Sequence, residues 1–267
     1  LTINITPLNV SAKFALMMKE SGAGFVFTSA TLSVDNELSH FNASLGLKPK
    51  QSMMVDSPFD YANQALLCLP RYLPQSHEDN MPHAIVKLTL ELIKSAKGRC
   101  FVLFTSYRMM HLVAEGLKTQ MDYPVYMQGQ MSKRIILEKF TRHGNAVLLG
   151  TASFWEGVDV RGSTLSCVII DKLPFAAPDD PLLQAKMQDC QMQGKDPFSH
   201  IQLPQAVIAL KQGVGRLIRD SKDKGVLVIC DNRLVTRQYG QVFLKSLPPM
   251  RRTRSLEDAN TFLKQIN

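Results

Sequence analysis

Long apolar runs, a leader peptide and clustered cysteines are all missing from this 267-residue sequence. No hydrophobic stretch approaches the roughly 18 residues that a membrane-spanning helix needs. The opening LTINITPLNV has neither the basic start nor the apolar core of a signal peptide, and it lacks an initiator methionine, so we expect a fragment or a processed product. The five cysteines include no CxxC pair, so we expect no metal site within the chain. Cys100, Cys167 and Cys230 lie in strand-like runs, which predicts buried, reduced thiols in a cytosolic protein.

The charge is unbalanced toward the basic side. Lysine and arginine number 31 against 23 acidic residues, for a net charge of +8 and a pI near 9.3. A generically basic surface explains this excess, and so does an electrostatic footprint for a polyanion such as nucleic acid. Composition alone leaves both explanations open.

Short apolar runs alternate with longer helical patterns along the chain. Most of the runs are nearly continuous rather than alternating, as expected for parallel strands that are covered on both faces. The pattern predicts an α/β fold, doubly wound, with a mainly parallel sheet and helices on both faces. The predicted strands are residues 24–32, 64–70, 99–106, 145–153, 165–174 and 225–231. The predicted helices lie near residues 10–20, 82–96, 107–119, 132–142, 179–193, 204–219, 237–246 and 255–266.

The stretch QGVGRLIRD, residues 212–220, places two glycines and two arginines inside the predicted helix 204–219. Each glycine in a helix interior costs about 1 kcal/mol relative to alanine. At 100° per residue, Arg216 and Arg219 share a face with Gln205 and Gln212, opposite an apolar stripe. A solvated cationic face is one interpretation, and a pair of arginines that reach one anionic ligand is the other.

Q-x-x-G-R-x-x-R is the pattern of motif VI of superfamily 2 helicases, and three further segments support the resemblance. FTSATLS (27–33) is similar to motif III of the XPD-like branch, LFTSYRMM (103–110) to motif IV, and GTASFWEGVDVRG (150–162) to motif V. KLPFAAPDDP (172–181) resembles a segment of the DinG and YoaA helicases. The chain therefore resembles the second RecA-like motor domain of a DinG/YoaA-type helicase. The expected division is an inter-domain connection with a leading helix (1–23), the motor domain (24–247) and a basic tail with a short helix (248–267).

The resemblance implies a nucleotide-facing set of residues. Arg219, and secondarily Arg216, would act as an arginine finger on the γ-phosphate of ATP, because a guanidinium carries permanent charge and forked donors. Gln212 lies in the same motif, and Glu156, Gly157 and Asp159 form the acidic-glycine core of motif V.

The same resemblance assigns a second set to single-stranded DNA. Thr105 and Ser106 end a predicted strand and open a helix, with Arg108 adding charge; a plain helix cap at Ser106 is the alternative. Thr151 and Ser153 follow the next strand. Trp155 is predicted either to stack on a base or to pack in the core. In motif III, the hydroxyls of 28–31 either relay between the nucleotide and DNA sites or satisfy a turn.

An ATPase needs a G-x-x-x-x-G-K-[ST] loop that holds the phosphates and a pair of acidic residues that bind Mg²⁺. The sequence contains neither motif. In the resembled family these parts, and an iron–sulfur cluster, belong to the first motor domain. ATP and Mg²⁺ would thus be shared with that domain of the same polypeptide, and this chain alone should be inactive. The family implies an ATP-dependent, 5′-to-3′ DNA helicase of repair or replication in the bacterial cytosol. It also suggests the chi accessory subunit of the replicative polymerase as a partner. The alternative is a non-enzymatic nucleic-acid-binding or partner-docking module with the same fold.

Overall fold

The structure, a computed structural model, describes residues 5–75, 78–118, 120–151, 154 and 164–267. The chain divides into two compact units. Unit 1 contains residues 1–56 and 174–209, and unit 2 contains residues 57–173 and 210–267. These limits do not follow the expected boundaries at residues 23 and 247, which stay a prediction about the domains of the intact protein.

Unit 2 is built on a seven-stranded sheet with the order β3-β4-β2-β5-β6-β1-β7, and every strand pair is parallel. The strands are β1 Ala65–Cys68, β2 Cys100–Leu103, β3 Val125–Met127, β4 Val147–Gly150, β5 Cys167–Ile170, β6 Gly225–Ile229 and β7 Arg251–Thr253. The α/β prediction with a parallel sheet is confirmed. Strands β1, β2, β4, β5 and β6 are buried throughout, which agrees with their continuous apolar sequences.

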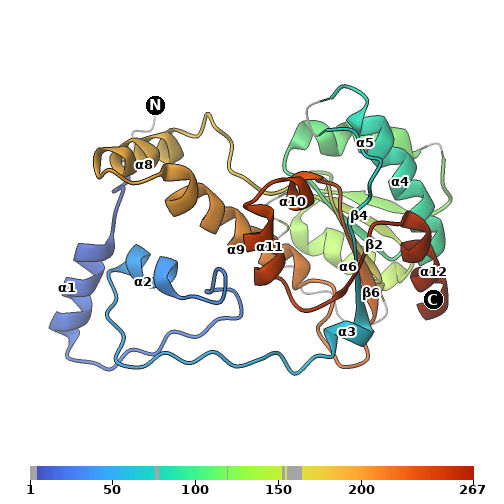
Figure 1. The fold of residues 1–267 in the computed structure, drawn as a ribbon. Coiled ribbons are helices and arrows are strands. Elements are labelled where there is room, and N and C mark those ends of the chain that lie inside the picture. The colour runs from blue at the N-terminus through green and yellow to red at the C-terminus, as the bar shows by residue number, and fades with distance from the viewer. Residues whose placement is uncertain (1–4, 76–77, 119, 152–153, 155–163) are drawn as a thin grey trace. The chain divides into compact units, whose positions relative to one another are not determined.

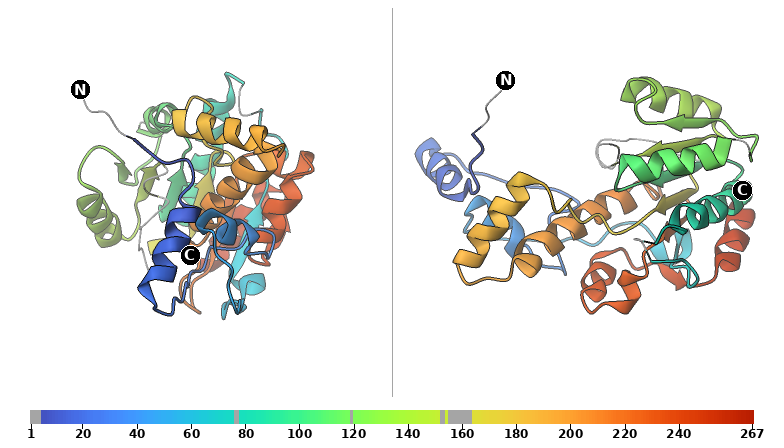
Figure 2. Two further views of the ribbon diagram at one scale, coloured as in Figure 1. Left: turned by 90° about the vertical axis from the view of Figure 1, so that its left-hand side faces the viewer. Right: turned by 90° about the horizontal axis from the view of Figure 1, so that it is seen from above.

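One face of the sheet is covered by α4 (Met81–Ala96), α5 (Tyr107–Lys118) and α12 (Leu256–Ile266). Helix α4 packs against both α5 and α12, and α12 lies beside α4 in Figures 1 and 2. Buried side chains of these helices form one cluster with alternate strand residues such as Val102 and Ile169. The intervening strand residues, including Phe101 and Val168, are also fully buried, so the opposite face is covered as well.

Further helices of unit 2 are α3 (Tyr61–Gln64), α6 (Lys133–His143), α10 (Arg233–Thr236) and α11 (Gly240–Ser246). Figure 1 shows α6 and α4 on opposite sides of strands β2 and β6. Ile136 and Phe140 of α6 are buried outside the cluster around α4, as expected for helices on both faces of the sheet. Unit 2 therefore has the predicted doubly wound arrangement, with helices on both faces of the sheet.

Unit 1 is mainly helical, with α1 (Ser11–Ser21), α2 (Ser39–Leu45), α8 (Pro181–Met192) and the π-helix η2 (Phe198–Gln202). Helix α9 (Leu203–Val214) contributes residues to both units. Gly46 ends α2 with a φ of +65°, and a Cβ there would lie 2.8 Å from the carbonyl oxygen of Ser11. Only glycine fits this close approach without movement of the backbone.

The predicted strand 24–32 is wrong, because the structure has irregular backbone there. Phe25, Val26 and Phe27 are exposed by 41%, 88% and 39%, and the only ladder contact near this segment is the isolated bridge between Val34 and Glu37. A strand requires a neighbouring strand for its backbone hydrogen bonds, and no described residue of this chain supplies one.

The tail beyond residue 247 is an integral part of unit 2. Strand β7 pairs with β1, and α12 buries Leu256, Ala259, Phe262 and Leu263. Ser255 caps α12 at the predicted start of the helix, since the backbone N–H of Asp258 donates to Ser255 Oγ at 3.4 Å. Strands β3 and β7 were missed because three-residue segments give no clear apolar run.

Candidate functional site

Polar side chains gather just beyond the carboxyl ends of four strands of unit 2. Thr105 follows β2, Thr151 follows β4, Asp171 follows β5 and Asp231 follows β6. Because all the strands are parallel, these ends lie at the same edge of the sheet. In open α/β sheets this edge is where ligands bind.

Thr105 is anchored to a buried carboxylate on the neighbouring strand. Its backbone N–H donates to Asp171 Oδ1 at 3.0 Å, and its hydroxyl donates to Asp171 Oδ2 at 3.3 Å. Asp171 is 1% exposed and also accepts from the backbone N–H of Lys172 at 2.7 Å. In this structure, both donor groups of Thr105 therefore point into the protein.

Burial has a marked effect on Asp171. Loss of solvation raises the pKa of this carboxyl to about 7, against the lowering effects of the Lys172 charge and of the hydrogen bonds from Lys172 and Thr105. Asp171 was not predicted as a site residue. The only signal in the sequence is an aspartate directly after an apolar strand, in VIIDKLP.

Ser106 caps α5, the helix that follows Thr105. Its Oγ accepts a hydrogen bond from the backbone N–H of Met109 at 3.3 Å, so the predicted cap is present. That bond uses an acceptor lone pair and leaves the hydroxyl proton of Ser106 for another acceptor. The side chains of Tyr107 and Arg108, the first two residues of α5, are exposed.

Thr151 is held by Gln128, which lies just after β3. The backbone N–H and the hydroxyl of Thr151 both donate to Gln128 Oε1, at 2.6 and 2.9 Å. The amide group of Gln128 in turn donates from Nε2 to Tyr107 Oη at 2.6 Å. The ends of β3 and β4 and the start of α5 are thus joined by one buried amide, which sequence reasoning missed.

Gly150, the last residue of β4, lies in close contact with Phe154. A Cβ on Gly150 would lie 2.8 Å from Phe154 Cβ, so the buried Phe154 ring packs directly over the backbone of Gly150. The Lys133 ammonium lies 5.2 Å from the centre of the same ring. The remaining predicted residues of this loop, Ser153, Trp155, Glu156, Gly157 and Asp159, lie outside the described residues.

The predicted arginine pair does not lie on a helix, which corrects the helical interpretation of residues 204–219. Helix α9 ends at Val214, and Arg216 lies in a turn in which its N–H donates to the carbonyl of Gly213 at 3.2 Å. The two glycines lower the helix propensity at this point. Arg216 and Arg219 are half-buried, as is Gln212 on α9. The apolar positions of the predicted stripe are nevertheless buried: Val207, Leu210, Val214, Leu217 and Ile218.

The loop of Arg219 is closed by Asp223. The carboxylate of Asp223 accepts from the backbone N–H groups of Arg219 and Asp220, both at 2.9 Å. Burial lowers the pKa of Arg219, and the nearby Asp223 charge opposes this. Gln64 Nε2 also donates to the carbonyls of Asp220 and Asp223, so this loop is tied to the start of β1.

Asp231 forms a second buried carboxylate centre at the sheet edge. It is 4% exposed, accepts from the backbone N–H of Leu173 at 2.9 Å and pairs with Arg233 at 2.7 Å. The hydrogen bond from Arg233 to Asp231 raises the pKa of Arg233. In unit 1, Ser29 Oγ accepts from the N–H of Thr31 at 3.2 Å, which is the turn-forming role considered for motif III.

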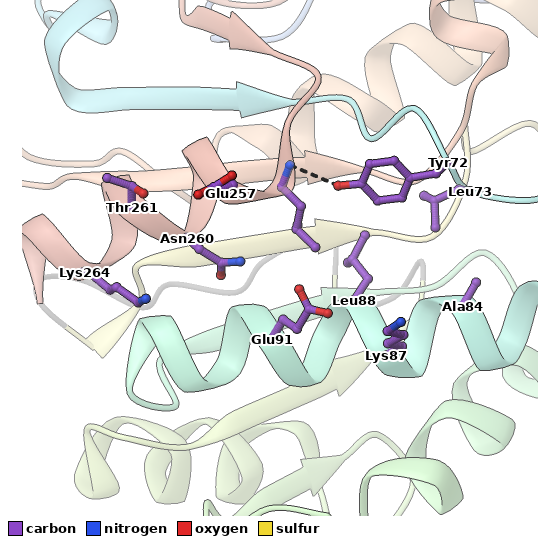
Figure 3. A pocket seen from close by; sticks show the side chains of 11 residues that line it. Tyr72, Leu73, Ala84, Lys87, Leu88, Glu91, Glu257, Asn260, Thr261 and Lys264 are labelled. Carbon is purple, nitrogen blue, oxygen red and sulfur yellow. Dashed lines mark hydrogen bonds between the residues drawn. The ribbon is translucent and has the colours of Figure 1, made fainter.

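A pocket of about 600 Å³ lies between α4 and α12, and it includes none of the predicted site residues. Figure 3 shows Lys87 and Glu91 on α4 facing Asn260 and Lys264 on α12. At one end, Tyr72 Oη accepts from the backbone N–H of Leu256 at 3.2 Å. The lining mixes both charge signs and therefore indicates no particular ligand.

The predicted burial of Cys100, Cys167 and Cys230 is confirmed. The five cysteines are buried free thiols, and burial raises the pKa of Cys68 to about 12. No group of histidine, cysteine or acidic side chains among the described residues is arranged to hold a metal ion. Within the same ranges, no helix combines the length and apolarity needed to cross a bilayer.

Solved structures with the same fold identify the class. The chain superposes on an XPD helicase with a TM-score of 0.69 at 19% identity, covering 92% of this chain and 45% of that one. Xpd4 of S. tokodaii gives a TM-score of 0.55 at 16% identity, over 78% of this chain and 42% of the other. The parallel sheet of this chain thus has the same fold as the corresponding part of these two structures.

The sequence comparisons then define the family. Residues 89–250 match the family model described as the helicase C-terminal domain, and the chain belongs to this family, in its XPD/DinG branch. The ATP-dependent DNA helicase YoaA of Escherichia coli K12 is 54% identical over 98% of this chain and 41% of its own length. YoaA of Haemophilus influenzae is 52% identical over 98% of this chain and 41% of its own length. The ATP-dependent helicase DinG of Mycobacterium tuberculosis H37Rv is 35% identical over 99% of this chain and 40% of its own length. This chain thus spans about two fifths of the length of these curated relatives.

Proposed function

We propose that this chain is the second motor domain of an ATP-dependent DNA helicase. The observation that carries the proposal is the 54% identity over 98% of the chain to the ATP-dependent DNA helicase YoaA. The position of the polar groups at the carboxyl edge of a parallel sheet supports it. The intact helicase moves along single-stranded DNA in the 5′-to-3′ direction and serves repair or replication.

In this proposal, the ATP site lies between two motor domains, and this domain supplies its arginine finger. Arg219, with Arg216 in support, contacts the γ-phosphate of an ATP held by the first motor domain, and Gln212 and the motif V residues Glu156, Gly157 and Asp159 line the same side. Arg219 is half-buried, and hydrogen bonds with Asp223 and Gln64 fix the backbone of the loop from which its side chain extends. We assign Mg²⁺ and any iron–sulfur cluster to the first motor domain, as the family resemblance implies.

The DNA track of the proposal lies across the ends of β2 and β4. Ser106 and Arg108 contact backbone phosphates, while Thr105 and Thr151, whose donor groups point inward to Asp171 and Gln128, shape the two loops. Ser153 and Trp155 extend the track within motif V.

The experiment is Arg219→Ala in the full-length protein, with single-stranded DNA-stimulated ATP hydrolysis as the readout. An arginine finger contributes about 10³–10⁵ in rate, so we expect stimulated hydrolysis to fall by at least about 10³-fold. Lys222→Ala is the matched control, because Lys222 is an exposed cation three residues further along the same loop. Wild-type turnover in Arg219→Ala would contradict the finger assignment.

Docking of a replication protein such as the chi subunit is a separate proposal for the tail. Removal of the tail at Pro248 would delete β7 and the buried face of α12, so it would test folding rather than docking. Lys264→Glu on the exposed side of α12 is the better variant. Loss of partner binding with unchanged ATP hydrolysis would support a docking surface on α12, and unchanged binding would exclude this position.

A further inference from the structure

Gln128 occupies an unusual position for a glutamine. It is 8% exposed, and its backbone N–H donates to the carbonyl of Leu149 at 2.9 Å, which continues the pairing of β3 with β4. The next residue, Gly129, has a φ of +95° and turns the chain away, with Gln130 Oε1 accepting from the N–H of Met127 at 3.1 Å. The backbone on both sides of Gln128 is therefore fixed, and its side chain has a defined direction.

The contacts of Gln128 determine which way its amide faces. A backbone N–H is always a donor, so the atom that lies 2.6 Å from the nitrogen of Thr151 has to be the carbonyl oxygen Oε1. The amide nitrogen Nε2 then lies 2.6 Å from Tyr107 Oη. Since Nε2 can only donate, Tyr107 Oη is the acceptor in this bond.

This polarity has a consequence for Tyr107. Its oxygen accepts from Gln128, so its own phenol proton points elsewhere. Tyr107 is 54% exposed and stands between Ser106 and Arg108 at the start of α5. The bond from Gln128 thus leaves the phenol proton of this exposed side chain available as a donor.

We propose that Gln128 is a positioning residue that orients the Tyr107 hydroxyl as a hydrogen-bond donor to a backbone phosphate of single-stranded DNA, and that it thereby couples the loop after β4 to the start of α5. The proposal rests on the proposed function. Thr151 donates to Gln128 Oε1, and Gln128 Nε2 donates to Tyr107 Oη. These bonds fix the distance between the loop after β4 and the start of α5. A phosphate bound at Tyr107 is then placed relative to the loop that carries Thr151.

The test uses the full-length protein and the concentration of oligo(dT) that half-saturates its ATP hydrolysis. Tyr107→Phe removes the phenol oxygen and keeps the ring, and Gln128→Ala removes the amide. Each is expected to raise the half-saturating concentration about 5- to 10-fold, with no more than about a twofold change in the maximal rate. The double variant is expected to be no worse than the more impaired single variant, because the two residues act through one bond.

Gln128→Glu separates orientation from space-filling. A carboxylate still accepts from Thr151, but it can only accept from Tyr107, so it turns the phenol proton inward. Affinity for oligo(dT) should fall at least as far as in Gln128→Ala, although shape is retained. Gln241→Ala is the matched control, since Gln241 is an exposed glutamine on α11, away from the Gln128 turn.

The outcomes are distinct. Provided that DNA stimulates ATP hydrolysis by the wild-type protein, any one of three results would overturn the inference. These are unchanged DNA affinity in Tyr107→Phe, full additivity in the double variant, and wild-type DNA affinity in Gln128→Glu. If the wild-type protein shows no DNA-stimulated hydrolysis, the proposed function fails and the inference fails with it. If the Gln128 variants do not fold, the DNA affinity of Tyr107→Phe alone tests the inference, because this variant removes only the hydroxyl of an exposed side chain.

Discussion

Asp171 accepts hydrogen bonds from both the backbone N–H and the hydroxyl of Thr105, which precedes it by 66 residues. The pair joins the ends of β2 and β5 at the edge of the sheet where the candidate site lies. A carboxylate with almost no solvent contact therefore holds the first turn of the loop that leads into α5.

The first prediction concerns the pH dependence of stability. The pKa of Asp171 is raised to about 7, so its contribution to folding is full below about pH 4 and is lost as the pH rises through about 7. The charge of the neighbouring Lys172 lowers the pKa of Asp171 and so opposes the effect of burial. Asp171→Asn keeps the shape and does not titrate. The free energy of unfolding of the wild-type chain, measured relative to Asp171→Asn by urea denaturation, should fall by about 1–4 kcal/mol between pH 4 and 7. If the free energy of unfolding changes equally with pH in the wild type and in Asp171→Asn, the prediction is refuted.

A second prediction tests Arg108 as a phosphate contact. In the full-length protein, Arg108→Ala should weaken binding to oligo(dT) and reduce the slope of log K against log salt by about 0.7. Tyr107→Phe should weaken binding without changing this slope, since a hydroxyl displaces no counterion. Lys94→Ala, an exposed cation on α4, is the control. An unaltered slope in Arg108→Ala would show that its charge lies in bulk solvent.

Gly150→Ala should destabilise the chain by about 1–3 kcal/mol, because the new Cβ would lie 2.8 Å from Phe154 Cβ. Gly24→Ala is the matched substitution, since no atom lies within 4 Å of a Cβ at that position. Thermal denaturation followed by circular dichroism compares them. Equal melting temperatures would mean that Phe154 moves aside at little cost.

The cap of α12 offers a fourth prediction. Ser255→Ala removes the acceptor for the N–H of Asp258, and we expect a loss of about 1 kcal/mol. Thr261→Ala, at an exposed position in the same helix, serves for comparison and should have an effect within about 0.5 kcal/mol. Urea denaturation of both variants measures the difference, and equal stabilities would rule out a contribution from the cap.

Local pattern predicted most of the elements correctly. The runs around Phe101, Leu148 and Val168 are buried strands, and the Ser255 cap begins a helix where expected. The errors occurred where a local pattern depends on distant partners. FVF at residues 25–27 has strand composition but no described strand to pair with, and the helical period through Arg216 and Arg219 ends at the glycines.

The amino-acid sequence by itself determined the parallel α/β class, the burial of Cys100, Cys167 and Cys230, and the order of the helicase motifs, because apolar continuity and motif spacing are local properties of the chain. Only the tertiary structure decided the partners of the motif residues. Thr105 meets Asp171 across 66 residues and Thr151 meets Gln128 across 23, and such contacts depend on which strands become neighbours in the sheet. Strand order follows from the packing of the whole domain, so no single segment encodes it.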